Sequence, residues 1–254
     1  MSQLTSHEVL TITFDSNVWE NIVDPSKRHK DEIYIKIYEA IGSNKIEPFF
    51  FEGLAILETI PKDKRKNYIG KFKPSYKIQI EDEVFTQQGT LPFDLSDYLK
   101  NNLPLALELG FKFIRIPRIG QPLVDQKYMS TLGDANMKER QDRSFECARF
   151  IENELGAGYQ YLKNILNMTG NQHLIHKTYS NEVLSDKKFA AGVAEWVDGD
   201  ALSAHYGYGI QYFCTNDNAR GAGSNSVFSI ENKGKLKDKF GINIIGPIEL
   251  IELI

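Results

Sequence analysis

Cysteine is scarce in this chain, because only Cys147 and Cys214 occur and they lie far apart. They form no CxxC pair, so neither a disulfide framework nor a zinc site is expected. No run of about 18 apolar residues occurs, which predicts that nothing spans a membrane. The first twenty residues contain Glu8 and Asp15 and lack a cationic start followed by an apolar stretch. We therefore expect no secretory signal, and a reducing cytoplasm fits best.

An excess of positive charge is also missing, since the formal net charge is −4. This argues against a protein that coats nucleic acid non-specifically, although a local basic patch could still bind it. The sequence has no internal repeat and no low-complexity tract. Its 254 residues, of which 41% are hydrophobic and 25% charged, are enough to bury a sizeable core. The composition is that of an ordinary globular protein.

Short β-rich runs alternate with longer helical segments, which predicts an α/β domain with a mostly parallel sheet. The texture changes between residues 61 and 137, where lysine-rich stretches and scattered prolines surround two strand-like runs and one helix-like run. We interpret 61–137 as an inserted α+β segment that could bind nucleic acid. The remaining residues, 1–60 and 138–254, would then form one discontinuous core domain. Its strands are expected at 8–14, 210–215 and 242–250, and the run 46–60 is expected to be a short strand that continues into a helix. Helical segments are expected at 31–45, 138–167 and 185–209.

Carboxylates follow two of the predicted strands. Asp15 follows the strand at 8–14, and Asp217 follows the strand at 210–215. In a parallel sheet the ligand crevice lies outside the carboxyl ends of the strands, so both acids should lie at one edge. Asp200 opens the run "DALSAHYGYG", which predicts a buried helix that starts at this carboxylate, where negative charge is favoured. Glu52 and Glu58 are candidates for a fourth acid.

Converging carboxylates repel one another, and a divalent cation is the natural compensation. Oxygen ligands of this kind suit Mg²⁺ or Mn²⁺. For each acid a blander explanation exists: a turn for Asp15 and Asp217, a helix N-cap for Asp200, and a solvated helix residue for Glu58.

Together these residues resemble the PIN-domain ribonucleases, a family that includes the toxin nucleases of bacterial toxin–antitoxin pairs. The resemblance covers about residues 8–60 and 140–254. The matching features are a strand that ends in Asp-Ser-Asn at Asp15, a late helical Glu at Glu58, "DALSA" from Asp200, and a strand that ends in Thr-Asn-Asp at Asp217. The final run "GINIIGPIEL" is also similar to the last strand of the family and its proline.

The resemblance implies a PIN-like three-layer α/β/α fold and metal-dependent endoribonuclease activity that leaves a 5′-phosphate and a 3′-hydroxyl. Mg²⁺ or Mn²⁺ would activate a water molecule, so no protein nucleophile is needed. It also implies RNA as the partner, with DNA as an alternative, together with an inhibitor or antitoxin protein and a homodimer as further options. The implied catalytic and metal-binding residues are Asp15, Glu58, Asp200 and Asp217, supported by Asn17 and Thr215.

Two choices stay open within this resemblance. Aromatic residues and Glu52 stand where the family has a small hydroxyl residue, so either Glu52 or Glu58 could be the second acid. Asp198 and Glu195 precede Asp200 closely, and either could share the site.

A cluster of cations interleaved with aromatic rings lies in the inserted segment. Cations that meet phosphates beside rings that stack on bases would suit single-stranded nucleic acid, although a solvated lysine-rich hairpin explains the same residues. Arg220, in the glycine-rich run "NARGAGSNS", is a further candidate for contact with phosphate. The cations predicted to bind nucleic acid in the inserted segment are Lys64, Arg65, Lys66, Lys71 and Lys73.

Two other classes of function compete with a nuclease. The run "DSNVW" partly resembles the nucleophile loop of haloacid-dehalogenase-type phosphohydrolases, but Asn17 replaces the second Asp of that loop. The third hypothesis is an inactive PIN-like module that binds nucleic acid or protein. A metal-dependent assay on RNA and on a phosphate monoester would separate the three.

Overall fold

A computed structural model describes residues 9–52, 77–81, 84–88, 97–116, 126–168, 187–219 and 223–254. Its strands are β1 (Leu10–Phe14), β2 (Ile46–Phe51), β3 (Lys77–Glu81), β4 (Val84–Gln88), β5 (Lys112–Ile114), β6 (Tyr212–Cys214) and β7 (Asn243–Ile245). Its α-helices are α1 (Ser16–Val23), α2 (Pro25–Arg28), α3 (Glu32–Gly42), α6 (Asp97–Glu108), α7 (Met137–Asn153), α8 (Tyr159–Ile165), α10 (Lys187–Tyr208), α11 (Ile230–Phe240) and α12 (Pro247–Ile251). Short 3₁₀ turns cover Gln126–Tyr128, Asp134–Asn136 and Gly223–Asn225.

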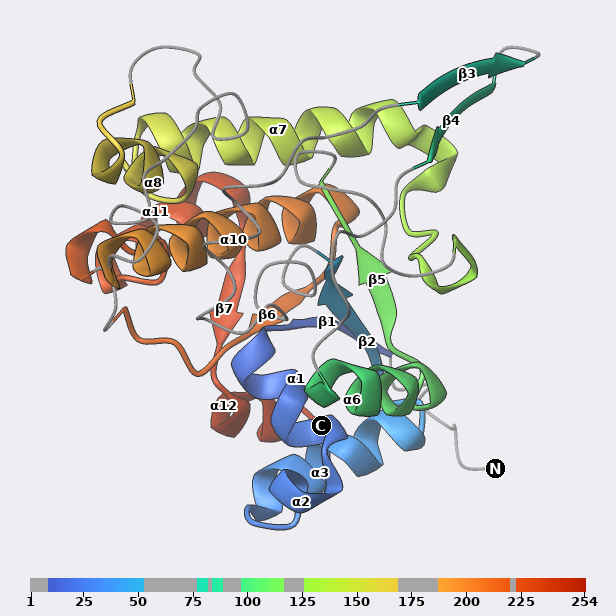
Figure 1. The fold of residues 1–254 in the computed structure, drawn as a ribbon. Helices are drawn as coiled ribbons and strands as arrows, with labels where there is room; N and C mark the ends of the chain where they lie inside the picture. The colour runs from blue at the N-terminus through green and yellow to red at the C-terminus, as the bar shows by residue number, and fades with distance from the viewer. Residues whose placement is uncertain are drawn as a thin grey trace, which may run out of the picture.

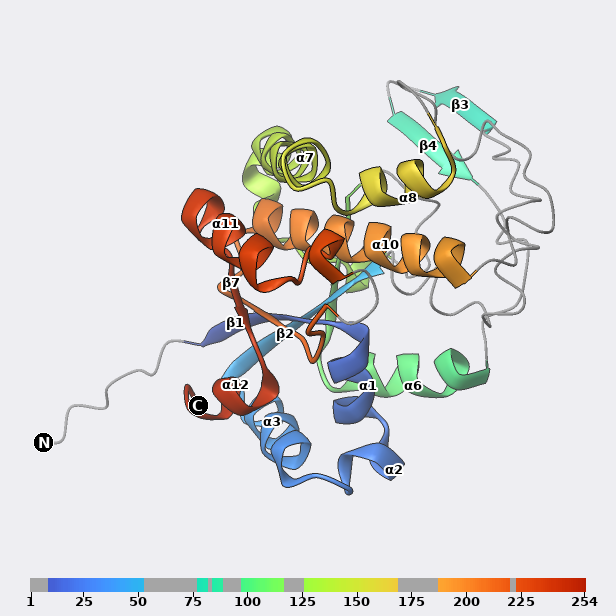
Figure 2. The same ribbon diagram turned by 90° about the vertical axis from the view of Figure 1, so that its left-hand side faces the viewer.

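Five parallel strands form the central sheet in the order β5-β2-β1-β6-β7 (Figures 1 and 2). The central strand β1 pairs with β2 on one side, where Phe14 lies opposite Phe50, and with β6 on the other, where Phe14 lies opposite Cys214. Strand order therefore reverses at β1, and a switch of this kind is where α/β sheets bind ligands. The predicted α/β class with a mostly parallel sheet is confirmed.

Helices cover both faces of this sheet in three layers (Figures 1 and 2). Helix α10 lies on one face and packs against α7 and α8 on its outer side, whereas α1, α3, α6 and α12 gather on the opposite face. Helix α11 joins the α10 side, because Phe240 contacts the rings of Tyr206 on α10 and Phe150 on α7. A parallel sheet needs apolar cover on both faces, which explains why most residues of its strands are apolar.

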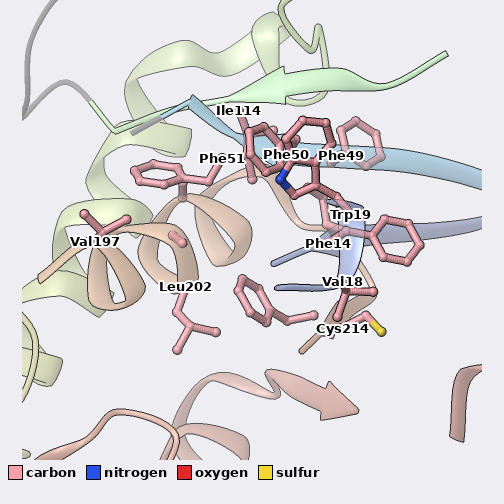
Figure 3. Close-up of a cluster of buried hydrophobic side chains, with 14 of the residues drawn as sticks. Phe14, Val18, Trp19, Phe49, Phe50, Phe51, Ile114, Val197, Leu202 and Cys214 are labelled. Carbon is pink, nitrogen blue, oxygen red and sulfur yellow. The ribbon is translucent and has the colours of Figure 1, made fainter. Parts of the chain in front are cut away.

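Aromatic side chains fill the space between the sheet and α1 (Figure 3). The ring of Trp19 lies 4.6 Å from that of Phe50, and the rings of Phe14 and Phe111 are 5.8 Å apart. All four side chains are buried, and rings at these distances attract one another beyond the burial of their area. This packing fixes β1, and with it the point at which the chain leaves the sheet.

Residues 97–116 lie inside the predicted insertion, yet they pack with the core domain. Strand β5 lies inside the predicted insertion, yet it pairs with β2 and forms an edge of the central sheet. Helix α6 packs against α1, and Phe111 and Phe113 belong to the main core. Strands β3 and β4 form a separate antiparallel hairpin, where the sequence had suggested one continuous strand-like run.

Two predicted element boundaries also change near the C-terminus. The predicted strand at 242–250 ends at Ile245, and α12 follows from Pro247, a residue suited to the first turn of a helix. The predicted helix start at Asp200 is wrong, since α10 already runs from Lys187 and Asp200 lies in its second half. The predicted strands at 8–14 and 210–215 and the helical segments at 31–45 and 185–209 are confirmed within a few residues, whereas the segment at 138–167 forms two helices, α7 and α8. The strand at the start of the 46–60 run is confirmed as β2, and residues 53–60 lie outside the described residues. Within the described ranges, no helix is long and apolar enough to cross a membrane.

Candidate active site at the carboxyl ends of β1 and β6

Asp15 lies where β1 leaves the sheet and α1 begins. Its backbone N–H donates to the carbonyl oxygen of Cys214 at 2.9 Å, which continues the pairing of β1 and β6 by one residue. The side chain is only 3% exposed. It caps α1, because its Oδ1 accepts a hydrogen bond from the N–H of Ser16 at 2.7 Å. The first turn of a helix favours negative charge, so the position suits a carboxylate.

Two side chains hold the second oxygen of Asp15. Oδ2 accepts hydrogen bonds from the amide of Asn17 at 2.7 Å and from the hydroxyl of Thr215 at 2.5 Å. Hydrogen bonds to a charged acceptor are short and strong, and three donors fix the side chain in one orientation. The predicted supporting roles of Asn17 and Thr215 thus have a geometric counterpart at Asp15.

Asp217 is tied to the same network by the hydroxyl of Thr215. That hydroxyl donates to Asp15 and accepts from the backbone N–H of Asp217 at 2.9 Å. The Asp217 side chain is half-buried, and its Oδ1 accepts from the N–H of Ala219 at 2.6 Å. One threonine therefore fixes both the carboxylate that follows β1 and the loop that carries the carboxylate after β6.

Asn216 attaches the loop after β6 to helices α1 and α3. Its backbone N–H donates to Oδ1 of Asn17 at 2.9 Å, and its side-chain amide donates to the hydroxyl of Tyr34 at 2.9 Å. Asn17 thereby bridges Asp15 and Asn216, one residue before Asp217. Hydrogen bonds to α1 and to α3 therefore hold the "Thr-Asn-Asp" run that follows β6.

Helix α10 brings Asp200 level with Asp15 along the strands. His205 on this helix lies 2.9 Å from the hydroxyl of Thr13, and the helix runs toward the amino end of β6, antiparallel to β1 (Figure 2). Five residues of helix back from His205 span about 7.5 Å, whereas two residues of strand forward from Thr13 span about 6.6 Å. Asp200 is 1% exposed, and Asp198, two residues before it, is half-buried.

Glu195 is a second buried acid on α10, and its Oε1 joins two other segments. It accepts hydrogen bonds from the N–H of Val227 at 2.6 Å and from the N–H of Gly158 at 3.3 Å. Burial raises the pKa of Glu195 from 4.5 to about 7, and the negative charge of Asp217 adds to this increase. The hydrogen bonds act in the opposite direction. The structure thus brings Glu195 into electrostatic contact with the site, as the sequence had left open.

His205 on α10 contacts β1 two residues before Asp15, and the sequence analysis did not single it out. It is 1% exposed, contacts Thr13 through Nδ1, and packs edge-on against the ring of Phe213. Burial lowers its pKa to about 3, so the ring is neutral at physiological pH. A neutral buried histidine beside a threonine hydroxyl fastens α10 to β1 two residues before Asp15, which is a structural role.

Glu52 directly follows β2 and is 3% exposed. The register of β1 and β2 pairs Phe14 with Phe50, so the carboxyl ends of the two strands meet beside Asp15. Glu58 lies outside the described residues. The predicted nucleic-acid contacts Lys64, Arg65, Lys66, Lys71, Lys73 and Arg220 lie outside them as well.

The donor chemistry at this edge fits a hard divalent cation in kind, because its acids offer carboxylate oxygens. The geometry fits less completely: within the ranges that the structure describes, no three His, Cys, Asp or Glu residues lie close enough together to hold a metal ion. A complete ligand set would need a further oxygen from outside these ranges or a shift of an acid on α10. Asp15, Asp217 and Asp200 are the described acids best placed to contribute.

Comparisons of the chain with protein-family models, with curated proteins and with solved structures give no match. The PIN-domain resemblance therefore depends on the sequence motifs alone. The strand order of the sheet and the hydrogen bonds of Asp15 are separate structural observations about the same residues.

Proposed function

We propose that this protein is a Mg²⁺- or Mn²⁺-dependent endoribonuclease that hydrolyses phosphodiester bonds in RNA and leaves 5′-phosphate and 3′-hydroxyl ends. The observation that carries the proposal is the link made by Thr215, whose hydroxyl bonds both the Asp15 carboxylate and the Asp217 backbone. Two acids fixed in this way beside the central strand, where the strand order reverses, are placed for ligand chemistry and add little to packing.

Each residue has a role in this proposal. Asp15 and Asp217, with Asp200, would hold the cation. When bound, the cation supplies positive charge beside the scissile phosphate and lowers the pKa of a coordinated water. Asn17 and Thr215 keep the Asp15 side chain in one rotamer, which limits the reorganisation that turnover requires. Asn216 holds the loop of Asp217 against α3. In this proposal a metal-activated water is the nucleophile, and no residue of the network is required to act as one.

The test is cleavage of single-stranded RNA by the purified protein with Mn²⁺ or Mg²⁺, compared with EDTA. We expect cleavage that chelation stops. Asp15→Asn should abolish turnover, because it removes the charge at the centre of the network without changing side-chain volume. Asp238→Asn is the matched control, since Asp238 is an exposed acid on α11. Undiminished cleavage by Asp15→Asn would contradict the proposal.

Two further measurements separate the alternative functions. Release of phosphate from a monoester, without cleavage of RNA, would favour a phosphohydrolase of the haloacid-dehalogenase type. A module that only binds its partner would cleave neither substrate. Thermal melts with EDTA and with Mn²⁺ test the metal site independently of turnover: a native-state ligand at a hundredfold excess over Kd stabilises by about 2.7 kcal/mol. Asp200→Asn should lose most of this gain, and an equal shift in both proteins would remove Asp200 from the site.

A further inference from the structure

A lysine on α11 contacts the segment that carries Asp217. The ammonium of Lys233 donates to the backbone carbonyl oxygen of Asp217 at 3.3 Å. The Lys233 side chain is half-buried, so its ammonium lies between the protein and solvent. Among the described residues, the sequence analysis assigned only acids and their polar supports to this edge of the sheet. Lys233 therefore adds a cation to the site.

The position of Lys233 is fixed by the start of α11. Ser229 caps the helix, and the amide of the buried Asn232 donates to the carbonyl oxygen of Ser226 at 2.8 Å. The N–H of Val227 is held by Glu195, as described above. The turn before α11 is thus bonded to α10 and to α11 itself, and Lys233 extends from a segment with little freedom to move.

The lysines of α11 differ in how their charges are compensated. Lys235 pairs with Glu231 at 2.6 Å. Lys239 lies 5.1 Å from the centre of the Phe150 ring, and Lys233 lies 5.8 Å from that of the Phe228 ring. Among the residues that the structure describes, neither Lys233 nor Lys237 forms an ion pair. These two are four residues apart, so they share one side of the helix at a spacing of about 6 Å along its axis.

The arrangement of Lys233 and Lys237 suits contact with phosphate groups better than a purely structural role in the protein interior. Lys237 is exposed, and the ammonium of Lys233 has a carbonyl oxygen as its hydrogen-bond acceptor, although an ammonium has three donors. The remaining donors of Lys233 can meet an anion that lies over Asp217. Two cations in a row beside a carboxylate site suit a chain of phosphates, of which one reaches the acids and its neighbours meet lysine.

We propose that Lys233 and Lys237 form a phosphate-binding stripe on α11 that holds a single-stranded RNA beside Asp217. The proposal rests on the proposed nuclease function for the identity of the strand. It adds two residues of α11 to the candidate RNA contacts that the sequence predicts in the inserted segment.

The experiment measures binding without cleavage, through the fluorescence anisotropy of a labelled single-stranded RNA in EDTA over a series of salt concentrations. The slope of log K against log salt is negative, and each lost phosphate contact lowers its magnitude by about 0.7 for single strands. Slopes are compared by their magnitude. The double variant Lys233→Gln with Lys237→Gln should therefore lower it by about 1.4 and weaken binding. Lys235→Gln is the matched control, because Lys235 is on the same helix but paired with Glu231. Melting curves of all variants in EDTA show whether each has the parent's fold.

The outcomes distinguish this inference from the nuclease proposal. A lower slope in the double variant and an unchanged slope in Lys235→Gln would support the stripe, even if the parent protein fails to cleave RNA with Mn²⁺. Equal slopes in the parent and the folded double variant would overturn the stripe, even if the parent cleaves RNA. Failure of the parent to bind RNA in EDTA would overturn it as well. If the double variant melts early, the single variant Lys237→Gln, at an exposed position, should lower the slope by about 0.7.

Discussion

Glu195 offers a quantitative test of the region beside Asp217. The perturbation is Glu195→Gln, which keeps the shape of the side chain and an oxygen that can accept the N–H groups of Val227 and Gly158. Burial raises the pKa of Glu195 from 4.5 to about 7, a change of about 2.5 pH units. At 1.36 kcal/mol per unit, this corresponds to about 3 kcal/mol.

The sign follows from proton binding. Between pH 4.5 and 7 the native state holds a proton on Glu195 that the unfolded state has released, so the free energy of unfolding falls as pH rises. The contribution of Glu195 to stability is complete below pH 4.5, is lost across this interval and does not change further above it. The Gln variant has no such group, and its stability relative to the parent should increase by about 3 kcal/mol from pH 4.5 to pH 8.

The assay is urea unfolding of parent and variant at a series of pH values, with the difference in free energy plotted against pH. Any constant effect of the new amide shifts this plot without changing its slope. Glu154→Gln serves as the control, since Glu154 is exposed at the end of α7. A difference that stays flat between pH 4.5 and 8 for Glu195→Gln would refute the reasoning.

Two other changes test packing and the Asp15 network. Gly207→Ala should cost about 1–3 kcal/mol in urea unfolding, because an added Cβ would overlap the Ser144 hydroxyl and lie 2.9 Å from the Arg140 carbonyl oxygen. At Gly234 an added Cβ meets nothing within 4 Å, so Gly234→Ala should stabilise α11 by about 0.5–1 kcal/mol. Equal effects of the two substitutions would contradict the close packing at Gly207. Thr215→Val should cost about 1.5–3 kcal/mol at neutral pH through the lost bond to Asp15, and the cost should shrink in acid as that carboxylate is protonated; a pH-independent cost would argue against the charged bond.

The main elements could be predicted because their signals are local. A run such as "LTITF" that ends in an acid indicates a buried strand and the edge of the sheet, and the parallel pattern then brings Asp15 and the loop of Asp217 together. Strand β5 could not be assigned to the central sheet in the same way. Its three residues pair with β2 across a long stretch of sequence, and no local pattern reports that pairing.

The helix start at Asp200 was wrong for a tertiary reason. Gly199, directly before Asp200, suggests a break in a helix, but it lies inside α10, where a Cβ would come 3.0 Å from the Cα of Gly158. The glycine is there for close approach to the start of α8. Lys233 escapes prediction as a site residue for a similar reason, because its hydrogen-bond partner is a backbone atom of a distant segment.

The distribution of buried acids supports a functional edge over a purely structural one. Carboxylates are rarely buried unless they are paired or used. Five are buried among the described residues, and one of them, Glu152, lies 3.7 Å from the ammonium of Lys163 on the α7–α8 side. The other four lie on α10 or directly after β1 and β2, and they are Asp15, Glu52, Glu195 and Asp200. Packing alone would favour apolar residues at such positions, and the presence of these acids on α10 and at the carboxyl ends of β1 and β2 is consistent with the cation site that we propose.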